Sequence, residues 1–292
     1  MPRPVPSPLP LAFLLVAACG YRGADPVGPE LARPPVRIVA GSVLAAEVLL
    51  EIAPRERIAA VHYLVADPSY SLVADTAAAL PLVGAEPEQL LSVGPDLVIV
   101  DAFTKPETLA VLAMAGVPVL RTTAPKGFAD IAANIGRIGR VCRLEAEADA
   151  LVTAMRARLD QLAARDPRIS GQRPLSLDGG MHTYGRGSLF DAVISAAGAR
   201  NLSAERGAGP FRIMNIEGVL AWRPETLVIV TGKDGEAGER EWIAQSPGFE
   251  FLPAVIHDRI LFVPSGLFGT TSHRIVDLVA FVQDGLLQQG PR

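Results

Sequence analysis

The 292-residue sequence is poor in cysteine, with only Cys19 and Cys142, and it contains no run of basic residues. Two thiols alone do not complete a tetrahedral zinc site or an iron–sulfur cluster. The formal net charge is −4, whereas neutralising a phosphate backbone requires clustered Lys and Arg side chains. The composition therefore argues against such metal centres and predicts no nucleic-acid partner.

Sequence motifs of common enzyme classes are also missing. There is no GxSxG or HExxH motif, and the glycine-rich segment GGMHTYGRGS at 179–188 has neither the GxGxxG spacing nor the Lys-Ser/Thr ending of nucleotide-binding loops. Asp178, at the end of a predicted strand, is a candidate base, although a strand-end aspartate often only caps the next turn. We predict a binding protein rather than an enzyme, with no intrinsic cofactor.

The N-terminus carries an apolar stretch of about ten residues within LPLAFLLVAACG, whereas a membrane-spanning helix needs about 20. Its length suits a secretory signal, so residues 1–19 are predicted to direct export to the periplasm or cell surface. The segment from Val16 to Cys19 resembles the lipobox of bacterial lipoproteins, which implies a lipid anchor on Cys19. A plain signal peptide that ends near a cysteine is the alternative. Residues 20–36 are rich in Pro and Gly and are predicted to be a flexible tether.

Beyond residue 36, short strand-like segments alternate with helical patterns. Strands are expected at 37–40, 97–101, 117–122, 174–178, 226–231 and 259–265, and helices at 43–53, 106–115, 188–199, around 240–246 and over 272–287. Such alternation is typical of βα units around a mainly parallel sheet. The predicted fold class is therefore α/β.

One sequence segment occurs twice in similar form. EQLLSVGPDLVIV at 88–100 returns as EGVLAWRPETLVIV at 217–230, and in each copy a glutamate, Glu88 or Glu217, stands seven residues before a proline. A repeat of this kind predicts two similar lobes. We expect two pseudo-equivalent Rossmann-like lobes over residues 37–143 and 172–292.

Residues 144–165, between the predicted lobes, contain no Gly or Pro and are dominated by strong helix formers. Acidic residues gather near the start of this segment and arginines near its end, as the helix dipole favours. At about 1.5 Å per residue the helix would be roughly 33 Å long. We predict one long rigid helix that joins the lobes and limits how far they open.

Two α/β lobes, a single linking helix and an exported N-terminus resemble the substrate-binding proteins of ABC importers for cobalamin, haem and iron–siderophore complexes. The resemblance covers about residues 36–290. Its landmarks are the two repeated segments at 88–100 and 217–230, the GxGS turn at 185–188 followed by Asn201-Leu202, and LPAV at 252–255. It implies capture of a bulky metal chelate between the lobes and delivery to an ABC permease with its ATPase.

In the resembled family a glutamate at the tip of each lobe docks on arginines of the permease. Glu88 and Glu217 fall at those places, and two like charges held a set distance apart by a stiff helix suit a cationic surface. The alternative is that each glutamate only favours a helix N-terminus.

Ligands of open α/β sheets bind beyond the carboxyl ends of the strands. The predicted cleft residues are His62, Tyr63, Tyr70, Asp101, Phe103, His182, Tyr184, Arg186, Thr231 and Phe268. Tyr184 matches the tyrosine that precedes the GxGS turn in the resembled family. His182 lies two residues earlier, so on an extended segment both side chains point the same way.

Three of these residues, His62, His182 and Tyr184, are the candidates for direct contact with a metal, because His and Tyr ligate haem iron. A single histidine is, however, more often a surface or core residue. Direct capture of a transition-metal ion, and a sensor lipoprotein that binds no chelate, are the alternative functions. The sequence does not choose among an iron–siderophore, haem and cobalamin.

Overall fold

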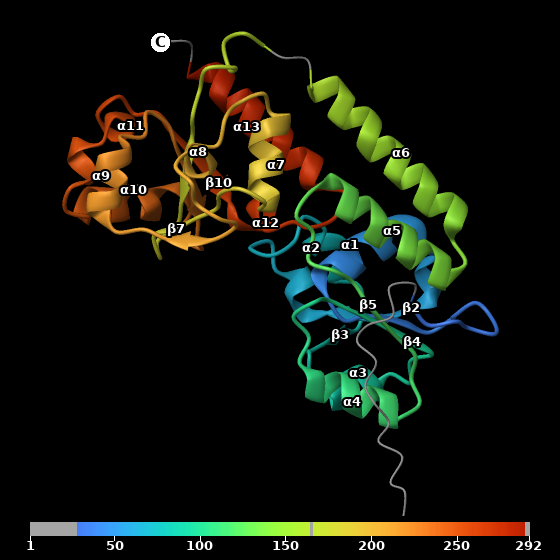
Figure 1. The fold of residues 1–292 in the computed structure, drawn as a ribbon. Helices are drawn as coiled ribbons and strands as arrows, with labels where there is room; N and C mark the ends of the chain where they lie inside the picture. Colours follow the sequence, from blue (N-terminus) through green and yellow to red (C-terminus); the bar gives the residue numbers. More distant parts are fainter. Residues whose placement is uncertain (1–27, 164–165, 290–292) are drawn as a thin grey trace, which may run out of the picture.

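The computed structural model describes residues 28–163 and 166–289 and shows two α/β lobes joined by a long helix, α6 (Figure 1). The predicted export signal with Cys19, and residues 20–27 of the predicted tether, lie outside the described residues. None of the helices in the two described ranges combines the length and apolar character that a membrane crossing requires.

The first lobe is built on a five-stranded parallel sheet in the order β3-β2-β1-β4-β5. Its elements are β1 (Ile38–Ala40), α1 (Val43–Ile52), η1 (Arg55–Arg57), β2 (Ile58–His62), η2 (Tyr63–Ala66), α2 (Ala74–Ala77), β3 (Leu82–Val83), α3 (Pro87–Ser92), β4 (Leu97–Val100), α4 (Pro106–Met114), β5 (Val119–Arg121) and α5 (Phe128–Cys142).

Both faces of this sheet are buried, and successive side chains alternate between them. In β4, Leu97 and Ile99 belong to the core that contains α1 and α5. Val98 and Val100 belong to the core that contains residues of α3 and α4. Parallel strands that helices cover on both sides read as continuous apolar runs, which is why LVIV is a strand rather than an alternating pattern.

The second lobe repeats the βα order around a smaller sheet. Its parallel sheet has three strands in the order β10-β9-β6, and β7 pairs separately with β8 in an antiparallel ladder. Its elements are β6 (Leu175–Leu177), β7 (His182–Thr183), α7 (Leu189–Ala196), α8 (Leu202–Glu205), β8 (Arg212–Ile213), α9 (Ile216–Trp222), β9 (Leu227–Thr231), α10 (Gly235–Gln245), η3 (Phe249–Phe251), α11 (Pro253–Ile256), β10 (Ile260–Pro264), α12 (Ser265–Phe268) and α13 (Ile275–Gln288). The α/β fold class is confirmed, but the parallel sheets of the two lobes differ, with five strands in the first and three in the second.

The linking helix α6 spans Glu145–Leu162, about 27 Å for its 18 residues. Arg143, with a φ of 55°, reverses the chain between α5 and α6. Gly139 allows these two helices to approach closely, because a Cβ atom there would lie 2.4 Å from the Cβ of Ala148. The helix lies within the predicted range 144–165, whose last two residues are outside the described part of the chain.

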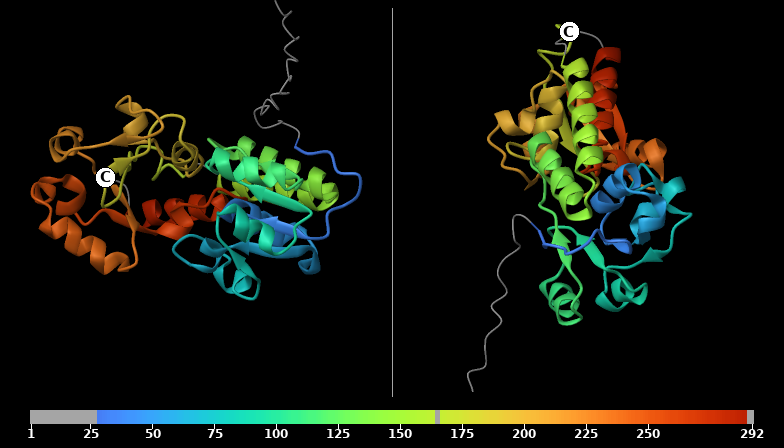
Figure 2. Two further views of the ribbon diagram at one scale, coloured as in Figure 1. Left: turned by 90° about the horizontal axis from the view of Figure 1, so that it is seen from below. Right: turned by 90° about the vertical axis from the view of Figure 1, so that its right-hand side faces the viewer.

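One hydrophobic core continues from the first lobe into the second. The same cluster of buried residues includes members of α1, α5 and α6 and members of α7, α12 and α13. α13 packs against both α6 and α7, and the right-hand view of Figure 2 shows α6 beside α13. The linking helix is therefore packed into a shared core, and this packing restricts the motion of the lobes.

Residues 28–36, which belong to the predicted tether, pack on the first lobe. The N–H group of Val36 donates to the Asp96 carboxylate at 2.7 Å, and the Arg57 guanidinium donates to the Pro35 carbonyl at 2.8 Å. Leu31 packs against the hydrophobic core. The prediction of a flexible tether is therefore corrected for residues 28–36.

Candidate functional site

The carboxyl ends of β1, β2 and β4 meet at one edge of the first sheet and border a cavity of about 260 Å³. His62, Asp101 and Phe103, three of the predicted cleft residues, are among its lining residues. In the order β3-β2-β1-β4-β5, the strand order reverses between β1 and β4, and such a switch point is where ligands bind in open α/β folds.

His62 is buried at this edge and caps η2 by accepting a hydrogen bond on Nδ1 from the N–H group of Leu64 at 3.3 Å. Burial lowers the pKa of His62, and the nearby Asp101 opposes this shift. The ring is therefore neutral at pH 7 and carries its proton on Nε2. Because the Nδ1 lone pair accepts from Leu64 and Nε2 carries the proton, the structure argues against His62 as a metal ligand.

Asp101 shapes the loop after β4. Its Oδ1 atom accepts hydrogen bonds from the N–H group of Phe103 at 2.9 Å and from the Thr104 hydroxyl at 3.2 Å. This turn leaves Phe103 83% exposed, and Tyr63 and Tyr70 are about half exposed. Aromatic side chains held outward near a cavity offer flat apolar surface to a ligand.

An aromatic cluster forms the corresponding wall of the second lobe. The ring centroids of Tyr184 lie 5.5 Å from Phe268 and 5.9 Å from Phe211, and Phe211 lies 5.0 Å from His182. These distances are typical of favourable aromatic pairs. Phe211 is 55% exposed, and the sequence analysis missed it because no periodic pattern or motif marks it.

Asn201 holds Tyr184 in place within this wall. Its side-chain amide donates to the Tyr184 carbonyl at 2.9 Å and to Asp191 at 3.1 Å, and its Oδ1 atom accepts from the N–H group of Ser203. Ser188 caps α7 by accepting from the N–H group of Asp191. The GxGS turn and the Asn201-Leu202 landmark therefore form one hydrogen-bonded unit that positions Tyr184.

His182 is oriented by Asp178. The Asp178 carboxylate accepts from the backbone N–H groups of Gly180 and His182 at 2.9 and 3.1 Å, and it lies 3.0 Å from Nδ1 of His182. In the neutral ring, a carboxylate at Nδ1 favours the tautomer with the proton on Nδ1 and the lone pair on Nε2, as in metal-bound histidines. Asp178 thus acts as the turn residue and as the partner of His182, and its candidacy as a base finds no support.

Two other predicted cleft residues contribute less. Thr231 is buried, and its hydroxyl donates to the Val263 carbonyl at 3.4 Å, so it belongs to the sheet rather than to the cleft wall. Arg186 is exposed, and its guanidinium donates to the Ala204 carbonyl at 3.4 Å. In residues 28–163 and 166–289, no three His, Cys, Asp or Glu side chains gather closely enough to hold a metal ion.

The walls meet where α12 contacts the loop that carries Tyr70. The Ser265 hydroxyl donates to the Ser69 carbonyl at 2.9 Å. Gly266 must be glycine at this contact, because a Cβ atom would lie 2.3 Å from the Pro68 carbonyl oxygen. Three residues later Phe268 packs on Tyr184. The two lobes are therefore in contact at α12, between the loop that carries Tyr70 and the aromatic cluster around Tyr184.

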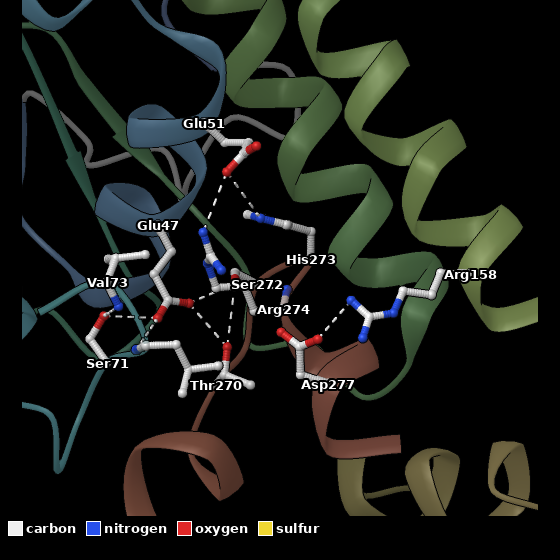
Figure 3. A network of polar contacts seen from close by, with 11 residues as sticks. Glu47, Glu51, Ser71, Val73, Arg158, Thr270, Ser272, His273, Arg274 and Asp277 are labelled. Carbon is white, nitrogen blue, oxygen red and sulfur yellow. Dashed lines mark hydrogen bonds and ion pairs between the residues drawn. The ribbon is translucent and has the colours of Figure 1, made fainter. Parts of the chain in front are cut away.

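Glu47 ties the lobes together next to this junction (Figure 3). Its side chain is fully buried on α1. One carboxylate oxygen accepts from the Ser71 hydroxyl at 2.9 Å and from the N–H group of Leu72 at 3.2 Å. The other accepts from Thr270 at 3.0 Å and Ser272 at 2.6 Å, in the segment that enters α13. Both oxygens are satisfied, each by one lobe.

A second set of polar contacts lies one helical turn away, at Glu51. Its carboxylate is 3.4 Å from the Arg274 guanidinium and 3.8 Å from Nε2 of His273. Burial, and then the adjacent Arg274 charge, lower the pKa of His273 to about 4. His273 is therefore uncharged at neutral pH, and Arg274 is the ionic partner of Glu51.

Glu88 and Glu217 occupy the same position in two short helices. Each is the second residue of its helix, α3 or α9, and each is exposed. Figure 1 shows these helices at opposite ends of the molecule. Neither carboxylate has an ion-pair or hydrogen-bond partner within the part of the chain that the structure describes.

Known proteins share this architecture. The cobalamin-binding protein of Halobacterium salinarum is 25% identical over 228 residues, which cover 74% of this chain but only 60% of that relative. The structure of the periplasmic haem-binding protein RhuT from Roseiflexus sp. RS-1 superposes with a TM-score of 0.73 at 25% identity, covering 86% of this chain and 98% of that one.

The vitamin B12 binding protein BtuF of Vibrio cholerae has the same fold, with a TM-score of 0.66 at 22% identity over 88% of this chain and 98% of that one. Residues 38–267 match the family model described as periplasmic binding protein. The members of this family bind solutes outside the cytoplasm rather than transform them, in agreement with the prediction of a binding protein. The chain belongs to the periplasmic binding protein family.

Proposed function

We propose that the protein is the substrate-binding component of an ABC importer and that it captures a metal-containing tetrapyrrole, haem or a corrinoid, between its lobes. The observation that carries this proposal is the His182–Asp178 pair, which favours a free Nε2 lone pair on a ring that contacts the exposed Phe211, as Tyr184 also does. A tetrapyrrole metal has axial positions open to a protein ligand, and its flat ring suits aromatic walls. The names of the haem-binding and cobalamin-binding relatives agree with this choice.

Tyr184 is the second candidate for contact with the metal. Burial, and then the Asp178 carboxylate, raise the pKa of its hydroxyl, so the free protein keeps the phenol protonated. His182, with its lone pair already exposed, is the better axial ligand, and Tyr184 supplies ring contact.

The test uses the chain from Gly20 onward with haemin, cyanocobalamin, ferrioxamine, Zn²⁺ and Mn²⁺, followed by visible spectra and thermal unfolding. A ligand at about 100 times its Kd should add about 2.7 kcal/mol of stability, which corresponds to roughly 5–11 °C at about 2–4 °C per kcal/mol. His182→Ala should shift the Soret band of bound haem and lower its affinity. His257→Ala is the matched control, because His257 is an exposed histidine outside the cleft.

The outcomes separate the alternatives. Stabilisation by ferrioxamine alone would exclude a tetrapyrrole, and stabilisation by Zn²⁺ or Mn²⁺ alone would favour direct ion capture. If none of these ligands binds, the sensor hypothesis replaces transport. An unchanged haem spectrum in His182→Ala would exclude this residue as the axial ligand.

We also propose that Glu88 and Glu217 dock the loaded protein on the permease, with its ATPase as the further partner. Their matched positions, exposure and lack of partners among the described residues support this role, although a glutamate also favours a helix N-terminus by about 0.3–1 kcal/mol. The double variant Glu88→Ala/Glu217→Ala should lose uptake and keep ligand affinity. The control Glu107→Ala/Glu147→Ala changes the charge equally at two other exposed positions and should keep uptake; equal uptake in both pairs would refute docking.

Export by residues 1–19 and a lipid anchor on Cys19 complete the proposal. They rest on the sequence, and mass spectrometry of the membrane-bound protein tests them. A mature chain that begins at Cys19 with an added lipid mass supports the anchor, whereas an unmodified N-terminus contradicts it.

A further inference from the structure

A cavity of about 690 Å³ lies on the second lobe, away from the predicted cleft. Its lining includes Arg173, Arg206, Trp222, Arg223, Glu225 and Arg259. Arg173 precedes β6, Glu225 precedes β9 and Arg259 directly precedes β10. The cavity is therefore at the amino ends of these strands, whereas the cleft lies at their carboxyl ends.

The lining is strongly positive. Four arginines and one glutamate give it a net charge of +3, in a chain whose formal net charge is −4. A fifth arginine, Arg212, lies with its guanidinium 5.4 Å from the centre of the Trp222 ring. Like charges gathered around one cavity repel each other unless an anion lies among them.

Arg206 and Arg223 are the arginines available to such an anion. Both are exposed, and neither side chain has a hydrogen-bond or ion-pair partner among the residues that the structure describes. Arg173 has a Glu205 oxygen at 4.0 Å, while Glu225 and Arg259 make other polar or electrostatic contacts within the chain. Arg223 has a φ of 49° at the C-cap of α9, a place where glycine is usual.

We propose that this cavity is a second binding site, which takes an oxyanion with two or more negative charges, such as a phosphate ester. The guanidinium fork pairs with phosphate oxygens through two parallel hydrogen bonds. Trp222 forms a flat apolar side of the cavity, against which an organic group attached to the anion would pack. This site is independent of the proposed chelate function, because it shares no residue with the cleft.

Inorganic pyrophosphate is the probe for the site. We expect it to bind at low ionic strength in isothermal titration calorimetry and to raise the melting temperature above that of a sodium chloride control of equal ionic strength. Arg206→Gln/Arg223→Gln should weaken this binding at least tenfold. The control Arg33→Gln/Arg156→Gln removes two exposed arginines outside the cavity and should bind like the unmodified protein.

A phospholipid headgroup carries the same chemistry, so vesicles of phosphatidylglycerol are tested beside vesicles of phosphatidylcholine. If pyrophosphate binds and Arg206→Gln/Arg223→Gln weakens this binding, the site takes a soluble ligand. If the protein binds only phosphatidylglycerol vesicles, and the same double variant weakens this binding, the site takes a lipid headgroup. No binding beyond the salt and phosphatidylcholine controls, or equal binding by both double variants, overturns the proposal. Circular dichroism checks that the variants are folded.

Discussion

Replacing Glu47 by alanine should destabilise the protein by about 3 kcal/mol. The change removes the acceptor of four hydrogen bonds at a fully buried site. A buried donor left without an acceptor costs about 1–3 kcal/mol. The buried Ser71 hydroxyl loses the acceptor that Glu47 provides, whereas the Thr270 and Ser272 hydroxyls, 3.3 Å apart, can bond to each other. Relief of the buried charge offsets part of the loss.

The melting temperature reports this loss of stability. At about 2–4 °C per kcal/mol for a chain of this size, the Glu47→Ala protein should melt roughly 6–12 °C lower. Glu47→Gln keeps the shape and one acceptor oxygen, so it should lose about half as much. Because the broken bonds join the two lobes, both variants should also bind the cleft ligand more weakly than the unmodified protein.

Glu51→Ala is the matched control for Glu47→Ala. Glu51 lies one turn further on α1 and contacts the same segment, but its side chain is 48% exposed, and such ion pairs contribute about 0–1 kcal/mol. Its melting temperature should therefore fall by at most a few degrees. If Glu47→Ala melts within 1 °C of the unmodified protein, or if Glu51→Ala loses as much, the network around Glu47 does not hold the lobes together.

Two further predictions follow from buried groups. The pKa of His273 is lowered from 6.5 to about 4, so the unfolded chain binds more protons at this residue than the folded chain does. The stability that depends on neutral His273 is present above about pH 6.5 and is lost as the pH falls towards 4, by about 3 kcal/mol at most. Chemical unfolding between pH 4.5 and 7.5 should show a shallower pH dependence in His273→Gln, and an unchanged slope would contradict the assignment. Burial raises the pKa of the Cys142 thiol to about 12, so iodoacetamide at pH 8 should label the folded chain from Gly20 far more slowly than the unfolded chain; equal rates would show that the thiol is accessible.

Local patterns were sufficient to predict most of the fold. The LVIV runs form β4 and β9, and the glycine-free segment after residue 144 forms α6. A continuous apolar run and a run of strong helix formers can both be recognised from neighbouring residues alone. The helix α5 was not predicted, although it is 15 residues long. The two-residue strands β7 and β8 were also missed, because the pairing of Thr183 with Arg212 joins segments too short to carry a periodic pattern.

The candidate site was predictable only in part. The rule that ligands bind at the carboxyl ends of strands pointed to the loops of His182, Tyr184 and Phe103. It could not show that the Nδ1 atom of His62 accepts a hydrogen bond from a backbone N–H group. Hydrogen bonds to a histidine ring decide which nitrogen is free. Those bonds depend on the folded loop rather than on the residue type.

By itself, the order of the residues determined the α/β class, the two lobes and the helix between them, because each arises from contacts close along the chain. Tertiary structure alone decided the rest. Glu47 meets Thr270 and Ser272 across more than 220 residues of sequence, and the arginines of the second cavity come from separate loops. The burial of Glu47 and the positive charge of the cavity depend on residues that are far apart in the sequence, and only folding brings these residues together.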